Sequence, residues 1–81
     1  MQQPTKIQIV EKVSLILSGK NTREEVCEWA SNYIRNDDII ELNDIEAWHF
    51  LVAISKIDEM IFPDIYLYSI DDIKEIMKEH Q

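Results

Sequence analysis

The sequence predicts an all-α fold, with a single domain of four helices spanning residues 1–81 around a buried central helix at about 44–57. Three observations favour this fold. Apolar residues recur at helical spacing in four separate stretches, and three of the stretches have a capping signal near their start. No stretch stands out for the alternating apolar and polar pattern of a strand. Hydrophobic residues make up 46% of the chain, which is enough to build a packed core.

The stretch at about 44–57 is the element around which the other helices are expected to pack. Two apolar rows run along it, formed by Ile45, Trp48, Leu51 and Val52 and by Ala47, Phe50, Ile54 and Ile57. A helix that is apolar around most of its circumference is packed on several sides by neighbours. Asn43 and Glu46, three residues apart, have the pattern of a capping box at its start.

The first helix is expected from about Thr5 to Ser18, after residues 1–4, which we expect to be disordered. Ile7, Val10, Val13 and Leu17 give it an apolar stripe. The only glycine of the chain, Gly19, follows directly. Glycine adopts the left-handed backbone that commonly ends a helix, so Gly19 marks the expected end of this one.

Capping residues also place the second and fourth helices. Thr22 with Glu25 three residues later is a capping-box pattern, and Arg35 suits the last turn of the same helix because cations interact well with free carbonyls. Ser69 with Asp72 three residues later predicts the start of the fourth helix.

The connection between the third and fourth helices, residues 58–68, is unusually apolar. Pro63 prevents it from continuing as a regular helix. We expect a loop, with at most a short 3₁₀ turn, that packs closely over the core.

The charge of the chain is uneven. Eight basic and sixteen acidic side chains give a net charge of −8, with an isoelectric point near 4.5. Residues 1–35 carry a net charge of +1 and residues 36–81 carry −9. Such a surface repels nucleic acid and anionic membranes and attracts a basic protein. The alternative is that acidic side chains only keep the protein in solution.

Signatures of catalysis and of cofactor or metal binding are missing from the sequence. One glycine cannot form a phosphate-binding loop, and no set of Cys and His residues has zinc spacing. Cys27 is the only cysteine and lies in a helical stripe, so we expect a core residue and a reducing, cytoplasmic location. The N-terminus does not resemble a secretion signal. The sequence therefore predicts a protein that is not an enzyme and has no cofactor.

Acidic groups near the ends of the predicted helices, together with two tyrosines, form the candidate partner-binding surface. Acidic side chains steer a basic partner, and tyrosines supply desolvated contacts. The alternative is that the acids cap helices and face solvent while the tyrosines belong to the core. The candidate residues are Asp37, Asp38, Glu41, Asp58, Glu59, Asp64, Tyr66, Tyr68, Asp71, Asp72 and Glu75.

Three segments carry a family resemblance: EEVCEWASNYI, DIEAWHFLVAI and YLYSIDDIKEIM. Over about residues 22–77 the chain resembles small all-α bacterial immunity proteins of contact-dependent growth inhibition and other polymorphic toxin systems. The shared residues are tryptophans, tyrosines and caps, which concern the fold. No residue that binds a toxin is carried over from the resemblance.

The resemblance implies a cytoplasmic inhibitor of a toxin domain, either a monomer or a 1:1 heterodimer with the toxin. Combined with the charge, it leads to the hypothesis of an immunity protein that occludes the basic cleft of a nuclease, with an RNase favoured. On this hypothesis the protein binds neither nucleic acid nor membrane directly. The alternative is an acidic regulatory adaptor or DNA-mimic modulator of a nucleic-acid-binding protein.

Overall fold

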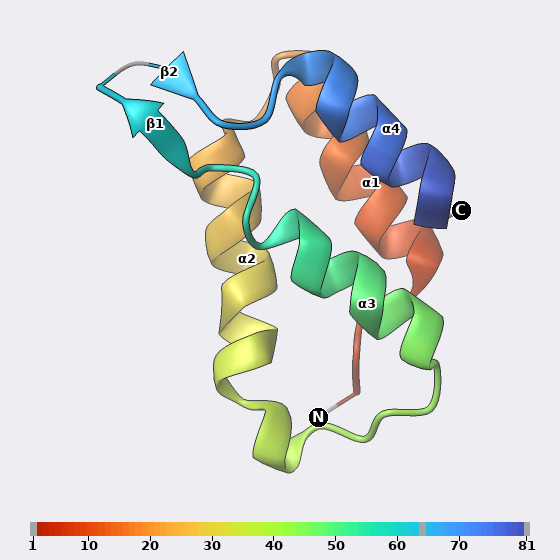
Figure 1. The fold of residues 1–81 in the computed structure, drawn as a ribbon. Coiled ribbons are helices and arrows are strands. Elements are labelled where there is room, and N and C mark those ends of the chain that lie inside the picture. Colours follow the sequence, from red (N-terminus) through yellow and green to blue (C-terminus); the bar gives the residue numbers. More distant parts are fainter. Residues whose placement is uncertain (1, 64, 81) are drawn as a thin grey trace.

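Four α-helices and one short antiparallel hairpin form the fold in the computed structural model, which describes residues 2–63 and 65–80 (Figure 1). The elements are α1 (Lys6–Leu17), α2 (Arg23–Arg35), the 3₁₀ turn η1 (Asp37–Ile39), α3 (Ile45–Ile54), β1 (Met60–Phe62), β2 (Ile65–Tyr66) and α4 (Ile70–His80). Because α3 contacts α1, α2 and α4, the predicted central helix is confirmed. The hairpin makes the fold mixed α and β, so the prediction of an all-α fold was wrong.

Reciprocal hydrogen bonds form the three capping boxes at the starts of α1, α2 and α4. The Thr22 hydroxyl accepts from the Glu25 amide, while the Glu25 carboxylate accepts from the Thr22 amide, both at 3.1 Å. Ser69 and Asp72 exchange the same two bonds at 3.1 and 2.9 Å. Thr5 and Gln8 form the third box. The sequence signals for the second and fourth helices are confirmed at these positions.

Gly19 ends α1 in the way that its position predicts. Its φ of 79° lies in the left-handed region, where glycine has no steric cost. The Gly19 amide donates to the Ile16 carbonyl and the Lys20 amide donates to the Leu15 carbonyl. This Schellman pattern satisfies carbonyls that would otherwise be unpaired at the end of the helix.

One face of α3 fills the centre of the core. Ala47, Phe50, Leu51 and Ile54 are fully buried, and Ile57 remains buried just beyond the helix. The helix ends at Ile54, three residues earlier than expected, because residues 55–58 form turns. Ile45 on the other predicted apolar row is exposed. Trp48 and Val52 of that row are half-buried, so the helix is fully buried on one face and only partly on the other.

The start of α3 is fixed by Gln3, about forty residues earlier in the chain. The side-chain Oε1 of Gln3 accepts from the backbone amides of Asn43 and Asp44, and its side-chain Nε2 donates to the Asp44 carbonyl. Asp44, rather than Asn43, caps the helix by accepting from the Ala47 amide. Gln3 and Pro4 are buried, so the expected disorder was wrong for these two residues; Met1 lies outside the described residues.

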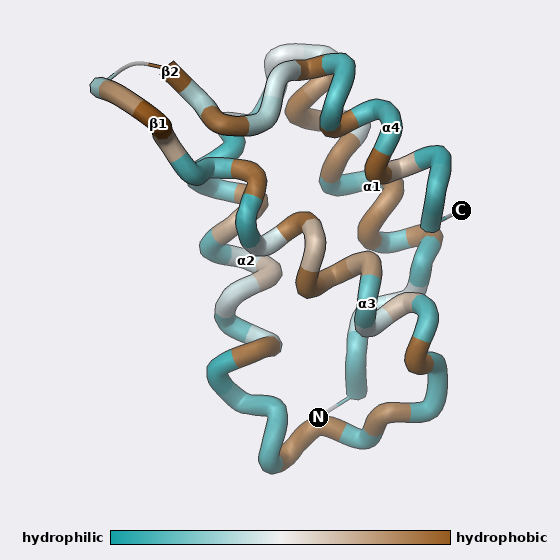
Figure 2. Tube along the Cα trace, viewed as in Figure 1, coloured by the Kyte–Doolittle hydropathy of each residue, from teal (hydrophilic) through white to brown (hydrophobic). Residues whose placement is uncertain are grey.

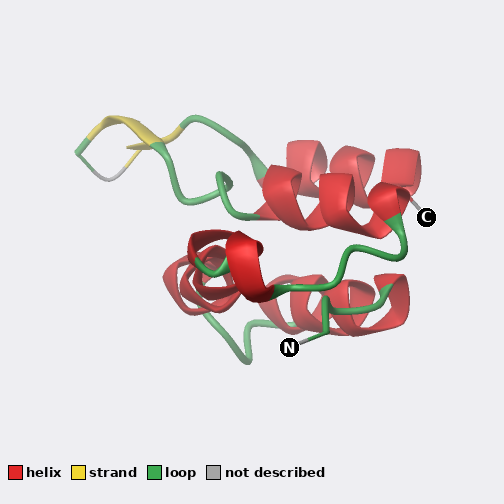
Figure 3. Cartoon of the chain, turned by 90° about the horizontal axis from the view of Figure 1, so that it is seen from below, coloured by secondary structure: helices red, strands yellow, loops and turns green. Residues whose placement is uncertain are grey.

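The hairpin projects from the helices instead of covering the core, as Figures 1 and 3 show from two directions. Met60, Ile61, Phe62 and Ile65 are between 50% and 63% exposed, and much of β1 and the start of β2 have the brown colour of hydrophobic residues in Figure 2. The expectation of a loop packed over the core was therefore wrong. The reason is that the buried faces of the four helices, with Ile57, already complete the core.

Candidate interaction surface

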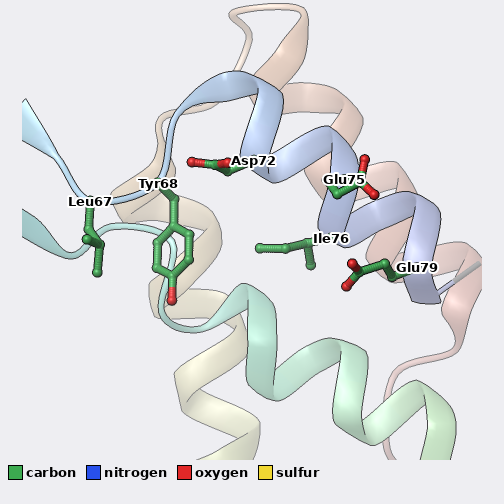
Figure 4. A pocket seen from close by; sticks show the side chains of 6 residues that line it. All are labelled: Leu67, Tyr68, Asp72, Glu75, Ile76 and Glu79. Atoms are coloured by element: carbon green, nitrogen blue, oxygen red, sulfur yellow. The ribbon is translucent and has the colours of Figure 1, made fainter.

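A cleft of about 360 Å³ opens between α4 and the segment that follows β2 (Figure 4). Leu67, Tyr68 and Ile76 supply apolar and aromatic surface. Asp72, Glu75 and Glu79 supply carboxylates, all from α4. In Figure 4 the Tyr68 ring and Ile76 project into the space between α4 and α3. The cleft therefore combines an apolar floor with an acidic side.

The spacing of α4 places these carboxylates in one row. Asp72, Glu75 and Glu79 are three and four residues apart, so they lie close to one helix face and span about 10 Å along its axis. Asp72 is partly committed to the capping box with Ser69. Glu75 and Glu79 form no ion pair within residues 2–63 and 65–80, so their charge is available to a ligand.

The structure brings together only part of the partner-binding surface predicted from the sequence. Three of those residues, Tyr68, Asp72 and Glu75, line the cleft. Residues 37–41 lie at the opposite end of the molecule from the hairpin (Figure 1), so the acidic groups do not form one surface. Asp64 lies outside the described residues.

The remaining predicted residues lie near the hairpin or at the start of α4. Glu59 holds the hairpin together, because its carbonyl accepts from the Leu67 amide at 2.8 Å. Asp58 lies between α3 and the hairpin, and Asp71 is exposed in the first turn of α4. Tyr66 contacts α2. A role of any of them in partner binding stays a prediction.

Arg23 is a structural residue of this surface that sequence reasoning missed. Its guanidinium donates to the Ile57 carbonyl at 3.4 Å and to the Tyr68 carbonyl. It also lies 4.1 Å from the centre of the Tyr66 ring, a cation–π arrangement. Arg23 thus ties the start of α2 to both ends of the hairpin segment. Nothing in its local sequence indicates these partners, which lie 34 to 45 residues away.

Tyr66 is held by a second contact from α2. Its hydroxyl donates to Glu24 Oε1 at 2.5 Å. This hydrogen bond lowers the pKa of the Glu24 carboxyl, since it favours the ionised form, and it raises the pKa of the Tyr66 hydroxyl for the converse reason. The hairpin is therefore attached to α2 by a contact that favours an ionised Glu24.

Replacing Tyr66 by phenylalanine should raise the pKa of Glu24 toward its ordinary value, because the hydroxyl donor is lost while the ring over Arg23 remains. A carbon-detected NMR titration of the carboxyl groups measures this pKa. Because the wild-type pKa is lowered, the contact stabilises the fold above the ordinary pKa of glutamate and is lost as the pH falls through the lowered value. Tyr33→Phe is the control and should leave Glu24 unchanged. Equal Glu24 pKa values in wild type and Tyr66→Phe would contradict the contact.

Cys27 is buried against α3, where its thiol donates to the Ile54 carbonyl at 3.2 Å. Burial raises the pKa of the thiol to about 12, with the nearby Asp58 carboxylate adding to the rise. A thiol with this pKa is almost fully protonated at neutral pH, and the thiolate is the nucleophilic form. The expectation of a core cysteine is confirmed.

The described part of the chain offers neither a cluster of metal-ligating side chains nor a membrane-spanning helix. Within residues 2–63 and 65–80, no three or more His, Cys, Asp or Glu side chains are grouped so that they could hold a metal ion. Over the same residues, every helix is too short or too polar to cross a membrane.

These features define a small acidic protein of four helices and an exposed hairpin, with an open cleft beside its last helix. The chain belongs to the family described as YxzC DNA-binding protein, which it matches over residues 2–80. A curated relative, the uncharacterized protein YxzC of Bacillus subtilis (strain 168), is 36% identical over 74 residues. These residues are 91% of this chain and 60% of the relative, so the chain spans about 60% of the relative's length. No solved structure shows significant similarity to the chain.

The family match corrects several expectations from the sequence. The resemblance to immunity proteins was wrong, because the matching family is a different one. The hypothesis of a toxin inhibitor and the toxin as partner are overturned with it. The expectation that the protein binds no nucleic acid is also contradicted by the description of the family. The residues behind the resemblance were tryptophans, tyrosines and helix caps, which concern the fold and do not specify a partner.

Proposed function

We propose that this protein functions in DNA binding, as a binding protein rather than an enzyme, in the cytoplasm. The observation that carries the proposal is the match to a family described as DNA-binding across residues 2–80. The match includes all four helices and the hairpin. The DNA-contacting surface would therefore belong to this fold.

Two exposed lysines of α4 are the best candidates for contacts with phosphates. Lys74 and Lys78 are four residues apart and share one helix face. Lys6 pairs with Glu46 at 3.0 Å and Arg35 pairs with Glu28 at 2.8 Å. Lys20 and Lys56 are exposed as well, but they are far apart in the sequence and do not share a helix face. Among the described residues, Lys74 and Lys78 form no ion pair, so their charge is available to DNA.

The net charge of −8 limits how strong such binding can be. At physiological salt the Debye length is about 8 Å, so distant carboxylates are screened. Glu75 and Glu79 are adjacent to Lys74 and Lys78 in α4, so their charge is not screened and weakens the attraction to phosphates. Neutralising about two phosphates gives a slope of log K against log salt near −2. We therefore propose weak binding with a shallow salt dependence.

Fluorescence anisotropy with a labelled DNA duplex of about 20 base pairs tests the proposal. Wild-type protein should bind, and affinity should fall between 50 and 200 mM salt by roughly tenfold. Lys74→Gln with Lys78→Gln should weaken binding and flatten the slope. Lys20→Gln with Lys56→Gln, which removes the same charge elsewhere, is the matched control and should have little effect. Affinity that rises with salt, or no binding at 50 mM salt, would contradict direct DNA contact.

A second candidate function is an acidic modulator that binds a basic nucleic-acid-binding protein. The observation in its favour is the concentration of negative charge in residues 36–81, which includes the acidic side of the cleft. Such a surface attracts the basic face that a DNA-binding partner presents. The two candidates differ in the anisotropy experiment, because a modulator would leave naked DNA unbound.

A further inference from the structure

Beside the cleft, the surface carries exposed apolar side chains that are not part of the core. Leu67 is 46% exposed at the edge of the cleft. It directly follows β2 in the sequence and so connects the cleft to the exposed hairpin. Contiguous exposed apolar residues bordered by charges are typical of protein interaction sites. The cleft and the hairpin thus form one apolar surface with carboxylates along one side.

The acidic row restricts the kind of ligand that fits. Glu75 and Glu79 are exposed and unpaired, and they lie on the same side of α4 as Ile76, which faces the cleft (Figure 4). A row spaced three and four residues apart on one helix matches basic side chains spaced in the same way on a second helix. An amphipathic partner helix would also place apolar residues against Leu67, Tyr68 and Ile76.

A second copy of this chain is a poor occupant. It would bring another charge of −8 toward the carboxylates of the cleft and toward Asp58 and Glu59 beside the hairpin. Like charges brought together at an interface oppose association. The charge of the cleft instead complements a positively charged segment.

We propose that this cleft, formed by α4 and residues 67–68, binds a lysine- or arginine-rich amphipathic helix of a partner protein. Basic side chains of the helix pair with Glu75 and Glu79, and its apolar face packs on Leu67, Tyr68 and Ile76. The inference deepens the second candidate function by naming the surface that such a modulator would use. It does not require the protein to bind DNA itself.

The test uses a synthetic helical peptide with leucines on one face and lysines at positions i, i+3 and i+7 beside them. A scrambled peptide of equal composition is the control ligand. Isothermal titration calorimetry without DNA measures binding to the full chain. We expect micromolar to sub-millimolar affinity for the amphipathic peptide and at least fivefold weaker binding of the scrambled one.

Matched variants locate the site. Glu75→Gln with Glu79→Gln should weaken binding about tenfold, because two exposed charge pairs are lost. Asp37→Asn with Asp38→Asn makes the same charge change at the far end of the molecule and should alter affinity less than twofold. Leu67→Ser should weaken binding about fivefold through lost apolar contact. Circular dichroism checks that each variant is folded.

Three outcomes would overturn the proposal: equal affinity for the scrambled peptide, equal losses in the cleft and far-end variants, or no heat of binding and no NMR shift changes at millimolar peptide. Because no DNA is present, these outcomes are independent of the anisotropy experiment. A basic protein that bound only at the far end, near Asp37 and Asp38, would retain the second candidate function and reject the cleft.

Discussion

Replacing Phe50 by alanine should destabilise the protein by about 3 to 5 kcal/mol, the largest loss that we expect from a single substitution. Phe50 is fully buried at the centre of α3 and belongs to the core shared by all four helices. Its ring also stacks on His80 near the end of α4, with ring centres 5.4 Å apart. Truncation removes this apolar contact and leaves a cavity that the surrounding helices fill only in part.

Urea denaturation followed by the fluorescence of Trp29 and Trp48 measures the loss. A domain of this length has an unfolding free energy of about 4 to 12 kcal/mol, so Phe50→Ala should remove a large share of it. Phe50→Leu keeps much of the volume and should remain measurable if the alanine variant is unfolded.

Phe62→Ala is the matched control, because Phe62 is the other phenylalanine of the chain and is 63% exposed on the hairpin. Its substitution should change the unfolding free energy by no more than about 0.5 kcal/mol. Similar losses for the two phenylalanines would show that the hairpin packs on the core in solution, contrary to the structure.

The helices could be predicted from the sequence because their signals are local. Thr22 with Glu25 and Ser69 with Asp72 form hydrogen bonds over three residues, and Gly19 adopts the backbone that ends α1. Such signals need no knowledge of distant parts of the chain. The prediction that Ala47, Phe50 and Ile54 form a buried row of α3 was also correct, because their spacing alone places them on one face of the helix.

The hairpin could not be predicted from hydrophobicity, because apolar content does not reveal whether a segment has space in the core. Residues 60–62 and 65–66 are as apolar as a buried strand, yet they lie outside the core that the four helices form, and most of them are exposed. Pro63, at the turn between two runs rich in β-branched and aromatic residues, was a usable hairpin signal. It was interpreted only as a residue that prevents a regular helix in a loop.

Other features depend on contacts between distant residues. Gln3 satisfies the Asn43 and Asp44 amides, and Asp44 rather than Asn43 caps α3. Similarly, the carboxylate row of α4 is visible in the sequence, but the apolar floor supplied by Leu67 and Tyr68 is not. The cleft arises only because the segment after the hairpin is held beside α4.

Arg23 is the residue that holds this segment in place. Its guanidinium bonds to the Ile57 carbonyl, just before the hairpin, and to the Tyr68 carbonyl, just after it. Both hydrogen bonds are partly buried, and an acceptor left without a partner there would lower the stability of the folded state. One side chain of α2 thus fixes the two ends of the hairpin and one wall of the cleft.

Arg23→Ala should therefore destabilise the protein by about 2 to 3 kcal/mol, since hydrogen bonds from a charged donor are among the stronger ones in proteins. It should also speed hydrogen exchange of the Leu67 amide, which donates to the Glu59 carbonyl inside the hairpin. Urea denaturation and NMR-detected exchange measure the two effects. Arg23→Lys should be intermediate, because an ammonium cannot reproduce the planar contacts of the guanidinium.

Arg35→Ala is the matched control at the other end of α2, where Arg35 pairs only with the exposed Glu28. An exposed ion pair of this kind contributes about 0 to 1 kcal/mol, so this variant should stay close to wild type and leave Leu67 exchange unchanged. If Arg23 positions the cleft, Arg23→Ala should also weaken binding of the basic peptide although Arg23 does not line the cleft. Equal stability of the two alanine variants, with unchanged Leu67 exchange, would refute this positioning role.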